Sequence, residues 1–186
     1  MTRIVGGSVG GRRLDVPSGT LTRPTSDRAR EGLFSTLEAL RGTLEGARVL
    51  DLYAGSGAVG LEAASRGARD VLLVDADTRA AQVIRANVAA LGLSGVVVRR
   101  DRVERLLAAP PQHRYDIVVA DPPYALPAED LAAVLRELVR QRWVVRGGLV
   151  VLERASRSGD WEWPAGLEPV RSRRYGEAHL WYGRRS

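Results

Sequence analysis

The chain has 186 residues, a length that fits one domain with a sizeable hydrophobic core. It contains no cysteine and only two histidines, which excludes disulfides and thiolate metal sites, so we expect no metal centre. Its longest apolar runs are far shorter than the ~20 residues of a membrane-spanning helix, and its start lacks the apolar segment of a secretory signal. We therefore expect a cytoplasmic protein without membrane association.

The net charge of +6 favours an anionic partner. The basic residues are all arginines, and two groups of them stand out. The group near the start consists of Arg3, Arg12, Arg13, Arg23, Arg28 and Arg30. The group near the end consists of Arg171, Arg173, Arg174, Arg184 and Arg185. We expect the first group to contact phosphates, and we interpret the second as solvated surface.

The start of the chain predicts a small extension that precedes the main domain. Residues 3–16 have the pattern of a glycine-turned hairpin, residues 17–26 that of a loop, and residues 27–40 that of an amphipathic helix. The predicted apolar face of this helix consists of Ala29, Leu33, Leu37 and Leu40. The nearest candidate for a boundary follows at residues 41–47. We therefore divide the chain into an extension, 1–45, and a domain, 46–186.

From residue 48 onward, β-branched runs alternate with amphipathic segments, which predicts a parallel sheet covered on both faces. The predicted strands are 48–53, 70–75, 95–100, 115–121 and 147–153, and the predicted helices are 61–67, 78–92, 102–109 and 128–142. Residues 168–183 predict two further strands around Gly176, an antiparallel hairpin that closes one edge. The expected fold is α/β, a doubly wound seven-stranded sheet.

The turn after the first of these strands matches the dinucleotide-binding pattern G-x-G-x-x-G in Gly55, Gly57 and Gly60. The strand also delivers Asp51, whose carboxylate is awkward beside a diphosphate but suits the ammonium and sulfonium groups of S-adenosylmethionine (SAM). Asp75 ends the next strand and could hold the ribose hydroxyls of either cofactor. The turn alone therefore favours SAM over NAD without deciding between them.

The segment Asp121-Pro122-Pro123-Tyr124 follows another predicted strand and should lie at the same edge of the sheet. Two prolines stiffen the loop, so the Asp121 carboxylate and the Pro122 carbonyl would be aimed into a cleft. These two acceptors and the flat ring of Tyr124 suit a planar exocyclic amine, as in guanine, adenine or cytosine. Methylation of a ring carbon is disfavoured, because it ordinarily needs a cysteine nucleophile.

Together, Asp51 to Gly57 ("DLYAGSG") and Asp121 to Tyr124 ("DPPY") resemble the class I SAM-dependent amino methyltransferases, which have a Rossmann-like fold. The longer segments "GRRLDVPSG", "TRPTSDRAREGLFSTL", "LDLYAGSGAVGLEAASRGA" and "RRYGEAHLWY" resemble the bacterial RsmD family in order and spacing. That family methylates the exocyclic N2 of a guanine in 16S ribosomal RNA, at guanine 966 in the family. The sequence departs from the family at Asp75, where Glu is common, and at Arg102, where a small residue is usual.

The resemblance implies roles for individual residues. Asp121, Pro122 and Tyr124 would be catalytic. SAM would be bound by Asp51, Gly55, Gly57, Asp75 and Asp101. The RNA would be bound by Arg3, Arg12, Arg13, Arg23 and Pro123, with residues 1–45 as the RNA-binding extension and 46–186 as the methyltransferase domain. The expected partner is 16S rRNA or the small ribosomal subunit, and the expected state is a monomer.

Three rival functions stay open at this point. A DNA amino methyltransferase would use the same Asp121 to Tyr124 site, but such enzymes generally carry a larger recognition segment. A protein-glutamine methyltransferase also takes a planar amide, yet its usual motif begins with Asn. A non-catalytic RNA-binding or assembly factor could retain the fold, although the intact Asp121 and Tyr124 argue against it.

Overall fold

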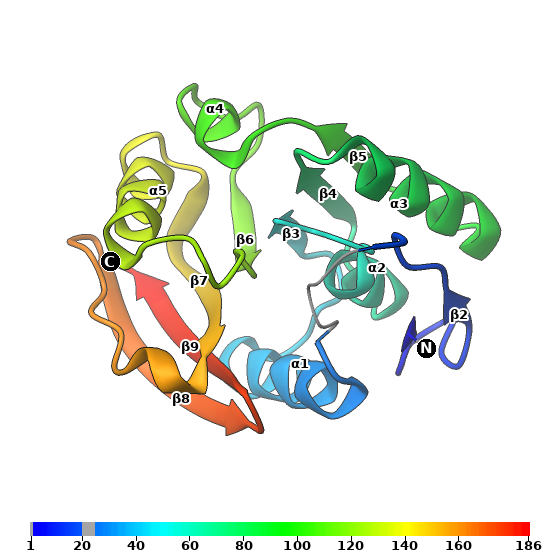
Figure 1. The fold of residues 1–186 in the computed structure, drawn as a ribbon, viewed down its shortest axis with the longest axis horizontal. Helices are drawn as coiled ribbons and strands as arrows, with labels where there is room; N and C mark the ends of the chain where they lie inside the picture. Colours follow the sequence, from blue (N-terminus) through cyan, green and yellow to red (C-terminus); the bar gives the residue numbers. More distant parts are fainter. Residues whose placement is uncertain (1, 20–24) are drawn as a thin grey trace.

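A computed structural model describes residues 2–19 and 25–186 (Figure 1). Its helices are α1 (Asp27–Arg41), α2 (Ala58–Ser65), α3 (Thr78–Leu91), α4 (Val103–Leu107), α5 (Ala128–Arg140) and a 3-10 turn, η1 (Ser156–Ser158). Its strands are β1 (Thr2–Arg3), β2 (Arg13–Leu14), β3 (Arg48–Leu52), β4 (Asp70–Asp75), β5 (Val96–Arg100), β6 (Tyr115–Ala120), β7 (Val144–Ala155), β8 (Leu167–Tyr175) and β9 (Ala178–Arg185). None of the helices in the described ranges is long and apolar enough to cross a membrane.

Seven strands form one mixed sheet in the order β5-β4-β3-β6-β7-β9-β8. The first five are parallel, whereas β9 is antiparallel to both β7 and β8. This arrangement confirms the predicted α/β fold with its C-terminal antiparallel hairpin. β7 is longer than predicted at both ends. It continues to Ala155, where it pairs with β9. It also begins at Val144, with extra residues before Leu149 where its register with β6 shifts.

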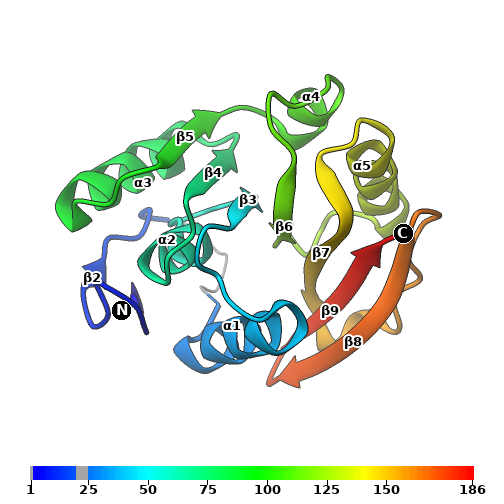
Figure 2. The same ribbon diagram turned by 180° about the vertical axis from the view of Figure 1, so that it is seen from behind.

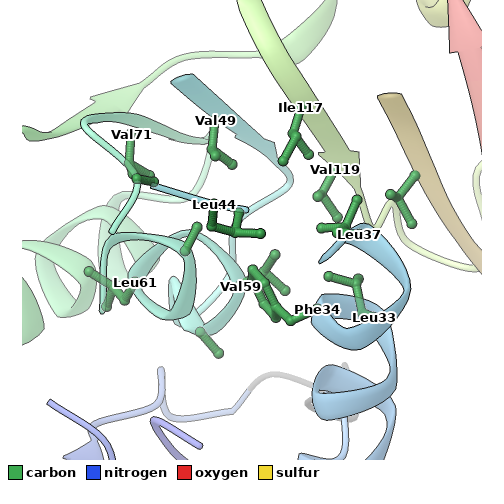
Figure 3. Packing of buried hydrophobic residues seen from close by; sticks show 14 of the residues in the cluster. Leu33, Phe34, Leu37, Leu44, Val49, Val59, Leu61, Val71, Ile117 and Val119 are labelled. Carbon is green, nitrogen blue, oxygen red and sulfur yellow. The ribbon is translucent and has the colours of Figure 1, made fainter. Parts of the chain in front are cut away.

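Helices cover both faces of the sheet, as Figures 1 and 2 show from opposite sides. Helices α1, α2 and α3 contribute buried residues to one hydrophobic cluster, and α4 and α5 contribute to another on the opposite face. Figure 3 shows the first cluster, in which Leu33, Phe34 and Leu37 of α1 meet the sheet residues Val49 and Val119. Alternate residues of each parallel strand point to opposite faces, so both faces are apolar.

Helix α1 begins where the sequence predicts. The Ser26 side chain accepts a hydrogen bond from the Ala29 amide at 3.1 Å, which is a typical N-cap contact. Of the predicted apolar face, Ala29, Leu33 and Leu37 are buried, and Leu40 packs against the core. Because Ile4, directly after β1, and Leu14 of β2 belong to the same cluster, residues before position 46 help to build the core.

The N-terminal hairpin is fastened to α2 by buried polar contacts. The Glu62 carboxylate accepts hydrogen bonds from the Val5 and Gly6 amides, both at 2.7 Å. One turn later, the Ser65 hydroxyl donates to the Gly6 carbonyl at 2.6 Å and accepts from the Val9 amide at 3.1 Å. These contacts satisfy backbone groups that the short strands β1 and β2 leave unpaired, so the hairpin is held in a fixed orientation.

Arg30 differs from the prediction for its group, because it is fully buried instead of facing an anionic partner. Its Nε lies 3.4 Å from Glu62 Oε2, and its Nη2 donates to the Arg3 carbonyl and to Asp27 Oδ1, the latter at 3.1 Å. Sequence spacing could not reveal this, since Arg30 lies on the α1 face that meets α2. The Arg30–Glu62 pair thus joins α1, α2 and the hairpin.

Replacing Glu62 with Gln should destabilise the protein by about 3 kcal/mol, because the buried Arg30 charge would lose its buried carboxylate and keep only the part-exposed Asp27. Urea unfolding measures the change. The matched control is Glu38→Gln, since Glu38 is half-exposed and lies 3.6 Å from Arg66; its cost should stay within about 0.5 kcal/mol. Equal losses in the two variants would contradict the role assigned to the buried pair.

Candidate active site

Four acidic side chains gather at the carboxyl edge of the parallel strands. Each lies on the face of the sheet that is directed toward α1 and α2. The residue two positions earlier points to the same face and is buried and apolar. They are Asp51 of β3, Asp75 of β4, Asp121 just after β6 and Glu153 of β7. Because β4, β3, β6 and β7 are neighbours in the sheet, the four carboxyl groups lie near one another at its edge, with Asp51 two residues deeper than the other three.

Asp51 is only 2% exposed. Its Oδ2 accepts a hydrogen bond from the Gly60 amide of α2 at 2.9 Å. Burial raises the pKa of the Asp51 carboxyl to about 7, the Gly60 hydrogen bond partly opposes this, and the charge of Asp75 adds to the increase. One Asp51 oxygen is thus committed to the start of α2, and a cationic ligand would stabilise the ionised form.

The glycine-rich turn has the backbone that its sequence predicts. Gly55 has φ of 58° and Gly57 has φ of 81°, conformations that side chains other than glycine rarely adopt. The Gly55 amide donates to Asp75 Oδ2 at 2.8 Å, and the Gly57 amide donates to the Ala54 carbonyl at 2.7 Å. Open space surrounds the position where a Gly55 side chain would begin, so a ligand could approach the backbone there.

Gly60 serves close helix packing. A Cβ atom at this position would lie 2.5 Å from Leu73 Cδ2 and 3.2 Å from Asp51 Oδ2. The third glycine of the G-x-G-x-x-G pattern therefore lets α2 approach β3 and β4.

Tyr53 is a feature that the sequence analysis missed. It lies between Asp51 and the glycine turn with φ of 60°, an uncommon conformation for a bulky residue. Within the described residues its buried hydroxyl has no hydrogen-bond partner, and burial raises the pKa of this phenol. Backbone strain of this kind concentrates at functional sites, and no sequence pattern signals it.

The Asp121 to Tyr124 loop follows β6 directly and begins beside β3, where the Asp121 amide donates to the Leu52 carbonyl at 3.4 Å. Pro122 is buried, Pro123 is exposed, and the Tyr124 side chain is half-exposed. Burial and the charges of Glu153 and Asp121 raise the pKa of the Tyr124 phenol, so its ring stands close to both acids. The loop thus combines a recessed carboxyl group with an accessible aromatic ring.

Glu153 and Thr25 also belong to this edge, and the sequence analysis assigned neither. Glu153 is 5% exposed, and the Thr25 hydroxyl donates to its Oε2 at 2.9 Å. Burial raises the pKa of Glu153, and burial together with Glu153 and Asp51 raises the pKa of Asp121 well above its usual range. The only sequence signal for Glu153 was its place at the end of the predicted strand 147–153.

Asp101 lies after β5, and two strands, β4 and β3, separate it from the strand that precedes Asp121. Its carboxylate accepts from the Arg102 amide at 2.9 Å and pairs with Arg99 Nη2 at 3.0 Å. The N-cap residue of α4 is Arg102, so Asp101 does not cap that helix. Arg105 Nε also lies 3.9 Å from Asp101 Oδ1, so this carboxylate has three polar partners among the described residues.

The predicted RNA-binding arginines differ in whether their side chains already have partners in the protein. Arg3 pairs with Asp27 at 2.9 Å, Arg12 donates to the Ala90 carbonyl at 2.9 Å, and Arg13 is exposed on β2. All three lie on the hairpin beside α2, whereas the Asp121 loop follows β6 (Figure 1). Arg23 lies outside the described residues.

The edge can bind a cation and accept hydrogen bonds from a planar amine. Its donors and acceptors are carboxylates, backbone amides and one hydroxyl, which suits a ligand that carries an ammonium, a ribose and a positively charged sulfur. In the described parts of the chain, no group of three or more His, Asp or Glu side chains is arranged to hold a metal ion. The carboxylates, backbone amides and hydroxyl of this edge fit SAM, which would supply an activated methyl group.

Known proteins resemble this chain over most of its length. The family described as "Conserved hypothetical protein 95" matches residues 2–184. A Bacillus subtilis (strain 168) relative, provisionally named rRNA methyltransferase YlbH, is 36% identical over 81% of this chain and 81% of its own length. The chain belongs to the RsmD family of methyltransferases.

Two further matches concern Escherichia coli. Ribosomal RNA small subunit methyltransferase D of strain K12 is 39% identical over 66% of this chain and 60% of that protein. A solved structure of the provisionally named methyltransferase yhhF has a TM-score of 0.87 at 31% identity and covers 100% of this chain and 98% of that one. The likeness to this structure thus extends over the N-terminal extension as well as the sheet.

Replacing Asp51 with Asn should stabilise the protein above pH 7. The folded-state pKa of about 7 is raised above the usual 3.8, so this carboxyl stabilises the fold at low pH and loses that contribution as pH rises through 7. The gain of Asp51→Asn in urea unfolding should be larger at pH 8 than at pH 5 by about 2–3 kcal/mol.

The matched control is Asp70→Asn. A hydrogen bond from Arg48 lowers the pKa of Asp70, so this variant should gain no stability at pH 8. A pH-independent effect of Asp51→Asn would show that Asp51 is not a proton-binding group of the folded state.

Proposed function

We propose that this protein methylates the exocyclic N2 of a guanine in 16S rRNA with SAM as the methyl donor, at guanine 966 as in its family. The observation that carries the proposal is the meeting of the glycine turn, Asp51 and the Asp121 to Tyr124 loop at one edge of the sheet. Membership of a family with relatives named as rRNA methyltransferases supports the same substrate class.

The proposed cofactor site is the turn between β3 and α2 with its neighbours. Gly55 and Gly57 would admit the amino acid end of SAM, and Asp51 would face its positive charge. Asp75 already accepts two amide hydrogen bonds, from Gly55 and Asp77, yet its oxygens keep acceptor capacity for ribose hydroxyls. Asp101, at the next strand end, would border the adenine.

The proposed catalytic group is the loop after β6. Asp121 and the Pro122 carbonyl would accept hydrogen bonds from the guanine amine and stabilise the positive charge that develops on its nitrogen. The half-exposed ring of Tyr124, with Pro123 beside it, would stack on the base. A guanine reaches such a recessed acid only when it is flipped out of its stack, which suits a loop or junction in folded RNA.

The proposed RNA-binding region is the extension, residues 1–45, acting as a monomer on the small ribosomal subunit. Arg12 and Arg13 lie on the hairpin that Glu62 and Ser65 hold in place, so a phosphate contact there would position the RNA without reading its sequence. Arg3 could contact a phosphate only if it broke its ion pair with Asp27 or bound both groups at once. Arg23 is proposed on its sequence position alone.

The test is incubation with methyl-labelled SAM and, in parallel, small ribosomal subunits that lack modifications, naked ribosomal RNA, and genomic DNA, followed by digestion to nucleosides. The proposal predicts N2-methylguanosine from the ribosomal samples alone. Label in DNA would favour an amino methyltransferase of DNA, and label in protein would favour a glutamine methyltransferase. Either outcome would overturn the proposed substrate.

Replacing Asp121 with Ala should lower the rate of methyl transfer by about 100-fold or more while leaving the affinities for SAM and RNA unchanged. Single-turnover transfer and equilibrium binding together measure this. Asp130→Ala, at an exposed acid in the first turn of α5, should leave all three quantities unchanged. Full transfer by Asp121→Ala would remove this residue from the proposed catalytic group.

A further inference from the structure

Glu153 occupies the strand position level with Asp121. Leu52, Ala120 and Leu152 form one row across β3, β6 and β7, and the next residues of β6 and β7 in that direction are Asp121 and Glu153. Thr25, from the segment before α1, donates to Glu153 Oε2 at 2.9 Å, and its hydroxyl also lowers the pKa of Asp121 by hydrogen bonding. The Thr25 hydroxyl therefore contacts the buried Glu153 carboxyl on the strand next to Asp121 and also acts on Asp121.

A threonine hydroxyl has a single proton, so it cannot donate to both carboxylates at once. When it donates to Glu153, it can only accept from a protonated Asp121. When it turns to donate to an ionised Asp121, it can accept from a protonated Glu153. Either arrangement satisfies all three groups with one proton on the carboxyl pair, whereas two ionised carboxylates would leave one without its donor and would repel each other.

Among the described residues, the groups that act on Asp121 are acids and a hydroxyl, while Arg157 and Glu177 act on the neighbouring Tyr124. Asp121 faces Glu153 from β7, Asp51 from β3 and Thr25 from the segment before α1, and Tyr124 faces both acids from their own edge. In residues 2–19 and 25–186, none of the ion pairs includes Asp51, Asp121 or Glu153. Sharing a proton is then the means by which these described groups limit their mutual repulsion.

We propose that Glu153 is a positioning residue for Asp121: linked by the Thr25 hydroxyl, the two carboxyl groups hold one proton between them, and Glu153 carries it when Asp121 receives the target amine. This inference rests on the proposed function, because the amine is that of the proposed guanine. Asp121 then faces the amine as an ionised acceptor, and its proton stays nearby.

The arrangement accounts for the proton that amine methylation must release. The nitrogen lone pair forms the new bond to the methyl carbon, the bond from that carbon to sulfur breaks, and its electron pair stays on sulfur. The nitrogen then carries one surplus proton, which Asp121 takes up to leave a neutral methylated amine. Release of one proton from the doubly protonated Asp121–Glu153 pair to water restores the initial state.

The first test needs neither cofactor nor RNA. Aspartate carboxyl carbons labelled with carbon-13 are titrated by NMR, and the Asp121 signal is assigned by its absence in Asp121→Asn. In the unaltered protein the Asp121 signal should change in two steps, as coupled groups do. In Glu153→Gln it should change in one step, with a midpoint lower by about one pH unit or more.

Thr25 supplies matched controls for the same titration. Thr25→Ser keeps the hydroxyl and should reproduce the two steps, whereas Thr25→Val keeps the size, removes the hydroxyl and should reduce the separation between them. Glu153→Gln and Thr25→Val should be non-additive in kcat/KM, because they interrupt one connection. An Asp121 titration that is identical in the unaltered protein and in Glu153→Gln overturns the inference, provided both melt cooperatively.

Kinetics separate this inference from the proposed function. For methylation of the small ribosomal subunit, Glu153→Gln should move the midpoint of the kcat–pH profile toward acid and lower its plateau severalfold, with the KM for SAM unchanged. Methylation of the subunit with an unshifted Asp121 titration overturns this inference and leaves the proposed function standing. A shifted titration with no nucleoside methylation by the unaltered protein overturns the proposed function alone.

Discussion

The site depends on the parallel alignment of β4, β3, β6 and β7. Parallel strands bring their carboxyl ends to one edge, and the period of two places Asp51, Asp75, Asp121 and Glu153 on the same face of that edge. Four acids so placed cannot all be well solvated. Burial raises the pKa of Asp51, Asp121 and Glu153, and repulsion from neighbouring acids raises the pKa of Asp51 and Asp121 further, so the sheet that positions these three acids also tunes how they bind protons.

Helix α2 connects this edge to the N-terminal extension. Its first turn supplies the Gly60 amide to Asp51, and its middle supplies Glu62 to the hairpin. A second connection runs through Asn87 of α3, whose amide group bonds the backbone of Asp15 and also donates to the Ser56 carbonyl in the glycine turn at 3.2 Å. The proposed RNA-binding region and the proposed cofactor turn are therefore connected by hydrogen bonds through α2 and α3.

The sequence predicted the fold well because its signals are local. Alternating patterns located all seven strands, and Ser26 and the apolar face of α1 located the first helix. Burial of long polar side chains was not predictable in this way. Arg30 was grouped with surface arginines, because nothing in its neighbours along the chain reveals that it lies against Glu62 on a different helix.

For the candidate site, motifs found the residues that lie on recognisable turns, Asp51 with the glycines and Asp121 with its prolines. They did not find Glu153 or Thr25, whose importance arises only from contact between segments 128 positions apart in the chain. Tyr53 was also missed, since its unusual backbone is imposed by the turn between β3 and α2 and not by its own preference. Tertiary contacts decide such residues, and a single sequence does not contain them in readable form.

The central claim is that the carboxyl edge of the sheet is where the methyl donor binds. Backbone amide NMR of the protein titrated with SAM tests it most directly. The account predicts saturable shifts of the Gly55, Gly57 and Asp75 amides, with the shifts at Gly55 and Gly57 weakened in Asp51→Asn. Shifts confined to the opposite edge, for instance around Gly92 and Gly67, or no saturable shifts at all, would contradict it.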